Sequence, residues 1–366
     1  MQGDRARQGR QFGRNWGEAR LKALVKTGPG AGNLAVREVA QPHAGPGQVV
    51  ISTAVGGLCG TDLHIAQGTL AIQTPRILGH ELAGTVAEIG QGVEGLALGL
   101  RVTTETDAGF CGTCPFCVRG DMHLCAERTG IGTSADGGFA DFVAVPARGV
   151  HPLPSGVDLL SGALTEPLAV AVRAVIERGR VRSGERVAVM GPGTIGLLAA
   201  QVAQTQGAAA TIIGLAGHRD RYELARDLGI GSHLALDDPG QAADVAEADG
   251  TMDVVLECSG AASAFERATR LLRKGGRLVL VGFYGERVSV DLDRAINREL
   301  TLIASRGKRP TSFHIALELM GSRQVDPGRL ITHRYPLEAW SRAFAAAEGI
   351  GAKVVLEIKA GIAPWP

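Results

Sequence analysis

The residues best suited to chemistry lie in one stretch, from Cys59 to Glu81. A thiol, a hydroxyl, a carboxylate and an imidazole occur within six residues, at Cys59, Thr61, Asp62 and His64. Twenty-one residues after the thiol follow Gly79, His80 and Glu81. A thiolate and a neutral imidazole are ligands that zinc selects, at about 2.3 Å and 2.0–2.1 Å. A lone cysteine or histidine is more often an ordinary packed side chain, but this combination predicts a metal site that still needs a third ligand.

Glu166 is a candidate for that third ligand. It precedes Pro167 in the sequence TEPLAVAV, and proline is favoured in the first turn of a helix. A carboxylate at a helix start also interacts favourably with the helix dipole without binding any metal. Both interpretations of Glu166 are open at this point.

A second group of cysteines has the spacing C-x2-C-x2-C-x7-C and comprises Cys111, Cys114, Cys117 and Cys125. Four thiolates this close together can complete a tetrahedral structural zinc site with no open position. An iron–sulfur cluster is the alternative, and the ligand spacing favours zinc. Zinc binding contributes on the order of 10 kcal/mol to folding such a loop. The sixth cysteine, Cys258, ends an apolar run and is expected to pack rather than react.

A glycine-rich turn opens the second half of the chain. The apolar run ERVAVM leads into Gly191, Gly193 and Gly196 in the sequence GPGTIG, and an apolar helical segment follows. Between a strand and a helix, this pattern predicts dinucleotide binding. The first glycine allows the tight turn, the second lets the backbone approach the pyrophosphate, and the third lets the helix pack on the strand. Thr194 and Ile195 begin the helix whose free N–H groups would face the phosphates.

Strand-like and helical runs then alternate through residues 211–215, 233–236, 252–257, 277–281 and 300–304. Six strands with helical crossovers predict a doubly wound parallel sheet, and therefore an α/β protein. Gly282 and Ser305 each follow one of these strands directly and complete the predicted cofactor-binding residues.

The sequence after the second predicted strand of this sheet bears on the choice of cofactor. NAD-binding domains usually carry an acidic residue about 20 residues beyond the first glycine. Here no acid appears before Asp220, and small residues are followed by His218, Arg219 and Arg221. Guanidinium groups bind a 2′-phosphate bidentately, which favours NADP. The alternative is that both arginines lie on a solvated first helical turn while Asp220 turns toward the ribose of NAD.

The remaining composition describes an ordinary globular protein of two domains. The chain has 366 residues, 45% of them hydrophobic and 20% charged, with a net charge of +1. This balance gives no reason to expect nucleic acid or a membrane as partner. Residues 1–20 carry arginines and glycines but no apolar segment, so we expect a disordered leader and no secretion signal. We therefore expect a cytoplasmic protein whose cysteines bind metal rather than form disulfides.

With both halves considered, the chain resembles the zinc-dependent medium-chain dehydrogenases of the alcohol and polyol dehydrogenase superfamily. The motifs that carry the resemblance are CGTDLH, LGHELAGTVAEIG, the four-cysteine segment, TEPLAV and GPGTIG. The resemblance implies a mostly-β GroES-like catalytic domain at 21–167, with a zinc lobe at 108–126. It also implies a Rossmann domain at 168–309 and a segment, 310–366, that returns to the catalytic domain.

The resemblance also implies roles for individual residues. Cys59, His80 and Glu166 match the catalytic zinc ligands, and Glu81 matches a neighbouring carboxylate that can replace a ligand. Asp62 matches the group that orients the histidine ligand, Thr61 the hydroxyl that contacts the alcohol, and His64 a histidine on the proton path to solvent. A glutamate ligand at 166 points to the polyol and threonine dehydrogenase branch. The implied reaction transfers hydride between a secondary alcohol or polyol, or the matching ketone, and NAD(P).

Two other classes compete with this interpretation. A zinc-independent quinone-type reductase of the same fold should lack Cys59 and the four cysteines, and a protein that only binds nucleotide has no need of an intact ligand set. The resemblance further implies two zinc ions per chain. The apolar strand LTLIAS, expected at a sheet edge, predicts a homodimer or homotetramer.

Overall fold

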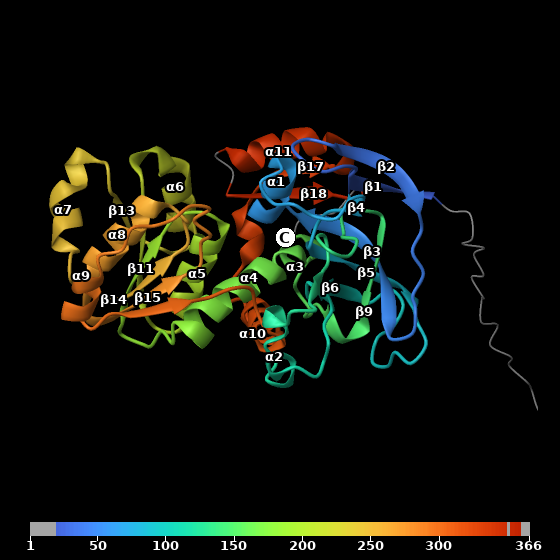
Figure 1. The fold of residues 1–366 in the computed structure, drawn as a ribbon, viewed down its shortest axis with the longest axis horizontal. Helices are drawn as coiled ribbons and strands as arrows, with labels where there is room; N and C mark the ends of the chain where they lie inside the picture. The colour runs from blue at the N-terminus through green and yellow to red at the C-terminus, as the bar shows by residue number, and fades with distance from the viewer. Residues whose placement is uncertain (1–19, 350–351, 360–366) are drawn as a thin grey trace, which may run out of the picture.

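The computed structural model describes residues 20–349 and 352–359, which form two lobes (Figure 1). The β-rich lobe combines the N-terminal strands with the last two strands of the described chain. The parallel-sheet lobe holds the middle of the chain. The leader predicted at residues 1–20 lies outside the described residues except for Arg20, which begins the first strand.

Antiparallel pairing builds the β-rich lobe around one strand, β3 (Gln48–Gly57). β3 pairs with β5 (Glu81–Ile89), β9 (Phe142–Pro146) and β18 (Lys353–Glu357). The other strands of this lobe are β1 (Arg20–Lys26), β2 (Leu34–Ala40), β4 (Arg76–Ile77), β6 (Arg101–Thr104), β7 (Asp107–Gly109), β8 (Thr129–Gly130), β10 (Val150–Pro152) and β17 (Ile331–Pro336). Its helices are α1 (Gly60–Gln67), α2 (Pro115–Val118), α3 (Leu159–Ala163) and α11 (Trp340–Glu348).

The other lobe contains a six-stranded sheet in which every pairing is parallel. In spatial order its strands are β13 (Ser232–Ala235), β12 (Ala209–Gly214), β11 (Arg186–Met190), β14 (Met252–Glu257), β15 (Leu272–Leu280) and β16 (Thr301–Ala304). This order is that of the doubly wound dinucleotide-binding fold, so the predicted fold class is confirmed. β15 begins five residues before the predicted strand, because Leu272 already pairs with Met252 ahead of a register shift.

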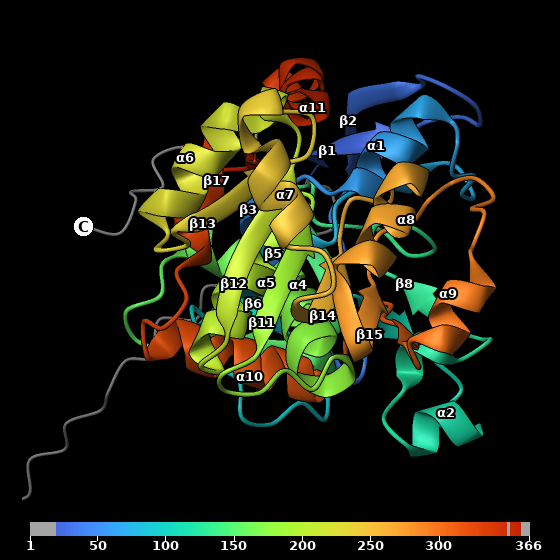
Figure 2. The ribbon, with the colours of Figure 1, turned by 90° about the vertical axis from the view of Figure 1, so that its left-hand side faces the viewer.

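Helices cover both faces of this sheet (Figure 2). Alternate residues of β11 separate the two cores, as expected for a strand buried on both sides. Val187 and Val189 belong to the core that includes α5 (Thr194–Thr205), whereas Ala188 and Met190 pack with α8 (Ala262–Leu271). The remaining helices of this part of the chain are α4 (Thr165–Val172), α6 (Arg219–Asp227), α7 (Ala242–Glu247), α9 (Leu292–Asn297) and α10 (Pro310–Gly321). The six-residue helices α7 and α9 were not predicted from the sequence.

The edge strand β16 and the segments before it expose apolar side chains. Leu302 is 41% exposed, and Phe283, Leu292 and Ile296 are between 65% and 80% exposed. In contrast, Cys258 packs beside the main core, where burial raises its pKa. Within the described ranges, no helix has both the length and the apolar character needed to span a membrane.

Candidate active site and zinc centres

Strand pairing brings the two halves of the Cys59–Glu81 stretch together. Gly57 at the end of β3 pairs with Glu81 at the start of β5. Cys59 therefore follows one strand end while His80 precedes the adjacent strand start. One ligand atom from each of Cys59, His80 and Glu81 lies within 4.8 Å of the others. The sheet register thus brings together a group that could hold a metal ion, from residues twenty-one and twenty-two positions apart.

Asp62 holds the cysteine in place from the first turn of α1. Cys59 is the residue before the helix, and its backbone N–H donates to Oδ2 of Asp62 at 3.0 Å. The other oxygen, Oδ1, faces Nδ1 of His80 at 3.9 Å. Neither of these two buried atoms has a hydrogen-bond partner among the described residues. A small shift of the imidazole would join them, which is how carboxylates orient metal-binding histidines.

The electrostatics of this group favour a bound cation. Burial acts to lower the pKa of His80, but the negative charges of Cys59 and Asp62 outweigh it and raise that pKa to about 10. Burial raises the pKa of the Asp62 carboxyl above its usual value. Surroundings that favour positive charge on His80 this strongly also favour a divalent metal ion. The donor set of thiolate, imidazole and carboxylate fits zinc.

Each of the two nearby glutamates is paired with a lysine whose side chain is 10% exposed or less. Lys353 forms an ion pair with Glu81 and also donates to the carbonyl oxygen of Leu58 at 2.7 Å. Lys308 forms an ion pair with Glu166. Burial opposes ionisation of Glu166, but the ammonium of Lys308 and the charge on His80 outweigh it and lower the pKa of that carboxyl.

The three residues whose ligand atoms lie within 4.8 Å of one another are Cys59, His80 and Glu81, so this group contains Glu81 and not Glu166. Glu166 lies in the first turn of α4, which sits between the two lobes (Figure 1). Neither lysine was predicted from the sequence. Each belongs to a segment far along the chain from its carboxylate, and no local motif marks it.

The two predicted proton-transfer residues occupy different positions on α1. Oγ1 of Thr61 lies 3.7 Å from Sγ of Cys59, so this hydroxyl borders the metal-binding group. His64 is exposed, and its Nδ1 lies 3.2 Å from Oγ1 of Thr69. The helix therefore leads from a half-buried hydroxyl to a solvent-facing imidazole.

The four predicted structural ligands also meet. Sγ of Cys111 lies 3.9 Å from that of Cys117 and 3.6 Å from that of Cys125, and the Cys114–Cys117 distance is 3.5 Å. Zinc–sulfur bonds of about 2.3 Å at tetrahedral angles place sulfur atoms about 3.8 Å apart, whereas a disulfide needs about 2.05 Å. Backbone N–H groups of Cys114 and Thr113 lower the pKa of Cys111 to about 6. The geometry fits a four-thiolate metal site.

This four-cysteine lobe, residues 108–126, is joined to the rest of the protein by a polar network that the sequence did not reveal. Asp121 accepts a hydrogen bond from Nε of Arg309 at 2.7 Å. The guanidinium of Arg173 lies 3.2 Å from Nε2 of His123 and forms an ion pair with Glu177. Burial lowers the pKa of His123 to about 4. The network links the lobe to α10 and to the helical turn after α4.

The glycine-rich turn has the geometry that dinucleotide binding requires. Gly191 has φ +95°, a conformation that side chains disfavour. A Cβ on Gly196 would lie 2.0 Å from the carbonyl oxygen of Gly191, so the helix approaches the turn too closely for any larger residue. A Cβ on Gly193 would meet nothing within 4 Å, which leaves open space at the start of α5. That space fits a pyrophosphate at a helix N-terminus.

The other predicted cofactor residues lie on the first turn of α5 and just beyond the carboxyl ends of β15 and β16. Thr194 donates its hydroxyl to the carbonyl oxygen of Ala352, and Ile195 is half-buried in the same helical turn. A Cβ on Gly282 would lie 2.4 Å from the backbone nitrogen of Gly260. Ser305 is buried, and its hydroxyl has no partner among the described residues.

The tip of β12 carries no acid, as predicted, but its surroundings are more mixed than the sequence indicated. Leu215 donates its N–H to Nδ1 of His218 at 3.1 Å. Arg219 is exposed on the first turn of α6, while Arg221 donates to the carbonyl oxygen of Gly349 at 3.0 Å. Asp237, which was not predicted from the sequence, accepts the N–H of Ala216 at 2.6 Å. Asp220 is exposed beside Arg219.

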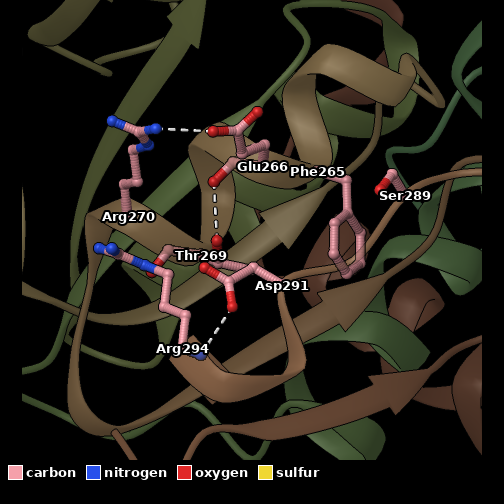
Figure 3. Close-up of a pocket in the computed structure, with 7 residues that line it drawn as sticks. All are labelled: Phe265, Glu266, Thr269, Arg270, Ser289, Asp291 and Arg294. Carbon is pink, nitrogen blue, oxygen red and sulfur yellow. Dashed lines mark hydrogen bonds and ion pairs between the residues drawn. The ribbon is translucent and has the colours of Figure 1, made fainter. Parts of the chain in front are cut away.

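A surface hollow between α8 and α9 is distinct from this site, as the separation of these helices from α1 shows (Figure 1). Its charged side chains are already engaged: Arg270 donates to Glu266 at 2.6 Å, and Asp291 accepts the N–H of Arg294 at 2.9 Å (Figure 3). Nothing in it resembles the ligand clusters.

Comparisons with known proteins agree with this geometry. Residues 45–155 match the family described as "Alcohol dehydrogenase GroES-like domain", and residues 194–322 match "Zinc-binding dehydrogenase". A sorbitol dehydrogenase of Halalkalibacterium halodurans is 40% identical over 92% of this chain and 99% of its own length. A D-arabitol-phosphate dehydrogenase of Enterococcus avium is 33% identical over 92% and 97%.

Among solved structures, a zinc-binding dehydrogenase of Sinorhizobium meliloti bound to NADP superposes with a TM-score of 0.85. It is 32% identical and covers 93% of this chain and 100% of its own. Sequence motifs, sheet topology, ligand clusters and relatives therefore agree, and the chain belongs to the zinc-dependent medium-chain alcohol dehydrogenase superfamily.

Proposed function

We propose that the protein interconverts a secondary alcohol group of a polyol and the matching ketone, with NADP as the preferred hydride carrier. The observation that carries this proposal is the assembly of Cys59, His80 and Glu81 at one end of the β3–β5 pair, close to the junction with the cofactor-binding lobe. The sorbitol and arabitol-phosphate dehydrogenases among the relatives support a polyol as substrate.

Cys59 and His80 would hold the catalytic zinc together with one carboxylate. The family resemblance points to Glu166, while the ligand distances point to Glu81. The four-cysteine lobe would hold a second, structural zinc. A zinc ion held by Cys59 and His80 would supply Lewis-acid polarisation of the substrate oxygen, and a bound nicotinamide would supply the hydride chemistry.

The protein's own residues would position the substrate and move its proton. Thr61, beside the sulfur of Cys59, would accept the alcohol proton. His64, exposed three residues later on α1, would pass the proton to solvent. Asp62 would fix the Cys59 backbone and orient His80.

Two features support the preference for NADP: the residue after β12 is a leucine, Leu215, rather than an acid, and the guanidinium of Arg219 is exposed. Arg221 supports it less, because its guanidinium already bonds to a backbone carbonyl. The relative bound to NADP favours the same choice. Asp237, close to the same turn, is the group that would favour NAD instead.

The proposal includes the organisation and setting of the chain. The divisions at 21–167, 168–309 and 310–366 are supported by the pairing of β18 with β3. A homodimer or homotetramer through β16 is supported by its position at the sheet edge and its exposed Leu302. Six free cysteines fit the reducing cytoplasm.

A chelation experiment tests the proposed activity. Oxidation of a panel of polyols and secondary alcohols is measured with NADP and with NAD, before and after removal of zinc. We expect turnover that disappears on chelation and returns with added zinc. Turnover that survives complete zinc removal would support a zinc-independent reductase, and absence of turnover with every alcohol and ketone would support a protein that only binds nucleotide.

A further inference from the structure

The ammonium of Lys308 lies beside the candidate catalytic centre and donates to two protein acceptors. These acceptors are Glu166 and, at 2.7 Å, Oγ1 of Thr106. An ammonium carries three N–H donors, and within the described ranges the third has no acceptor. The Lys308 side chain is only 10% exposed, so bulk water has limited access to this donor. An ammonium with one N–H left over can take a further acceptor, such as an oxygen of an anionic ligand.

The loop that carries Lys308 is held rigidly. Arg309 bonds to Asp121 of the four-cysteine lobe, and the hydroxyl of Ser312 donates to Glu177 at 2.8 Å. The backbone N–H of Arg309 donates to that same hydroxyl at 3.0 Å. The ammonium is therefore preorganised, which reduces the entropy lost when a ligand binds it.

The charges around the centre leave room for an anionic ligand. With all four acidic groups ionised around a bound metal ion, Cys59, Asp62, Glu81 and Glu166 would supply four negative charges, while Lys308 and Lys353 supply two positive ones. A zinc dication would balance the remainder, so the loaded centre is neutral despite its four acidic groups. Without Lys308 it would carry a net negative charge and repel an anion.

Together these observations point to Lys308 as a residue that recognises an anionic group of the substrate. We propose that the alcohol substrate carries a carboxylate or a phosphate, and that this group binds the free N–H of Lys308. The proposal rests on the dehydrogenase activity proposed above. It makes Lys308 a specificity-determining residue that selects anionic polyols over neutral ones.

The test compares matched substrates. Pentitols and hexitols are each assayed against their terminal phosphate and their aldonate with the zinc-loaded enzyme and its variants Lys308→Ala and Lys308→Arg. A surface variant, Lys22→Ala, is the control, because Lys22 also pairs with a glutamate, Glu338, but is 59% exposed. Zinc content is measured for every protein, and binding of the best anionic substrate to each is measured by calorimetry at low and high salt.

We expect the wild type to show a higher kcat/KM for one anionic series than for the parent polyols. The phosphate and aldonate arms identify which group is recognised. Lys308→Ala should lower kcat/KM for the anionic substrate about 10- to 100-fold, the range expected for a charge-assisted hydrogen bond. It should change that of neutral polyols far less, and Lys308→Arg should retain the anion preference. High salt should weaken anion binding in the wild type.

A wild type that prefers neutral polyols would overturn the proposal, and it does so even if Lys308→Ala does not fold. Equal losses for neutral and anionic substrates in Lys308→Ala would also overturn it, since Lys308 would then act only on Glu166. Absence of turnover with every alcohol would instead reject the dehydrogenase activity itself.

Discussion

Replacing Cys114 by serine tests whether the four-cysteine lobe depends on a metal of its own. The lobe has almost no apolar interior: Phe116, Val118 and Leu124 are 39%, 74% and 41% exposed. Its only helix of α type, α2, is four residues long. Metal binding must therefore supply most of the free energy that orders it.

The relative sizes of the interactions predict the outcome. A structural zinc contributes on the order of 10 kcal/mol. The Asp121–Arg309 and His123–Arg173 contacts are partly buried and involve charged groups, so each contributes about 1–3 kcal/mol. Loss of the zinc exceeds what these contacts can offset. We expect the lobe to unfold locally, while the separate cores of the parallel sheet keep the rest folded.

The assay combines metal analysis with hydrogen exchange. Cys114→Ser should reduce the zinc content from two ions per chain to one and should raise amide exchange across residues 108–126. Activity should also fall, because Arg309, which is adjacent to Lys308, loses its hydrogen bond to Asp121. Cys258→Ala is the matched control, since this cysteine belongs to neither cluster, and it should keep both ions. A Cys114→Ser protein that retains two zinc ions, or that loses both together, would refute the reasoning.

Three further predictions concern catalysis, cofactor choice and assembly. Cys59→Ser should lose one zinc and about 1,000-fold or more of kcat without unfolding, because the metal supplies several kcal/mol of transition-state stabilisation; zinc content, kcat and the unfolding temperature check this. Arg219→Ala should lower kcat/KM about tenfold with NADP and leave NAD unaffected; an unchanged NADP value would show that this arginine does not bind the phosphate. Leu302→Lys should convert the proposed oligomer to smaller species, because it places a charge on an exposed apolar edge strand; sedimentation at micromolar concentration measures this, and a wild type that is already monomeric would contradict it.

The parallel-sheet lobe was the more predictable half of the fold. Its strands are continuous apolar runs, and its glycine-rich turn is typical of dinucleotide-binding folds. The runs predicted at 211–215, 233–236, 252–257, 277–281 and 300–304 each correspond to one strand of the sheet. The short helices α7 and α9 were missed because six residues carry little periodicity. For the β-rich lobe, the resemblance implied a mostly-β domain completed by the C-terminal segment. The order of its strands could not be predicted, because pairings such as β3 with β18 join residues about 300 positions apart.

The candidate site, like the fold, contains residues that the sequence predicted and residues that it did not. The four cysteines could be predicted as metal ligands from the sequence, because their spacing alone is typical of a tetrahedral zinc site. Cys59 and His80 were grouped by residue type and then matched to zinc ligands through the resemblance, and the register of Gly57 with Glu81 supplies the physical reason for their meeting. Asp237 at the cofactor turn was missed because it lies in the turn after the neighbouring strand β13 rather than directly after β12.

The lysines that balance the site lie beyond any local motif. The Lys308–Glu166 pair spans 142 positions in sequence, and a lysine in a run such as SRGKRP reads as a solvated cation until the fold places it. Ligand identity is a local property of the chain, whereas charge balance depends on which distant segments meet. A relative with the same cysteine, histidine and glutamate motifs but a neutral residue at the position of Lys308 should therefore bind zinc equally well. Its centre would carry one more net negative charge, and it should prefer uncharged polyols.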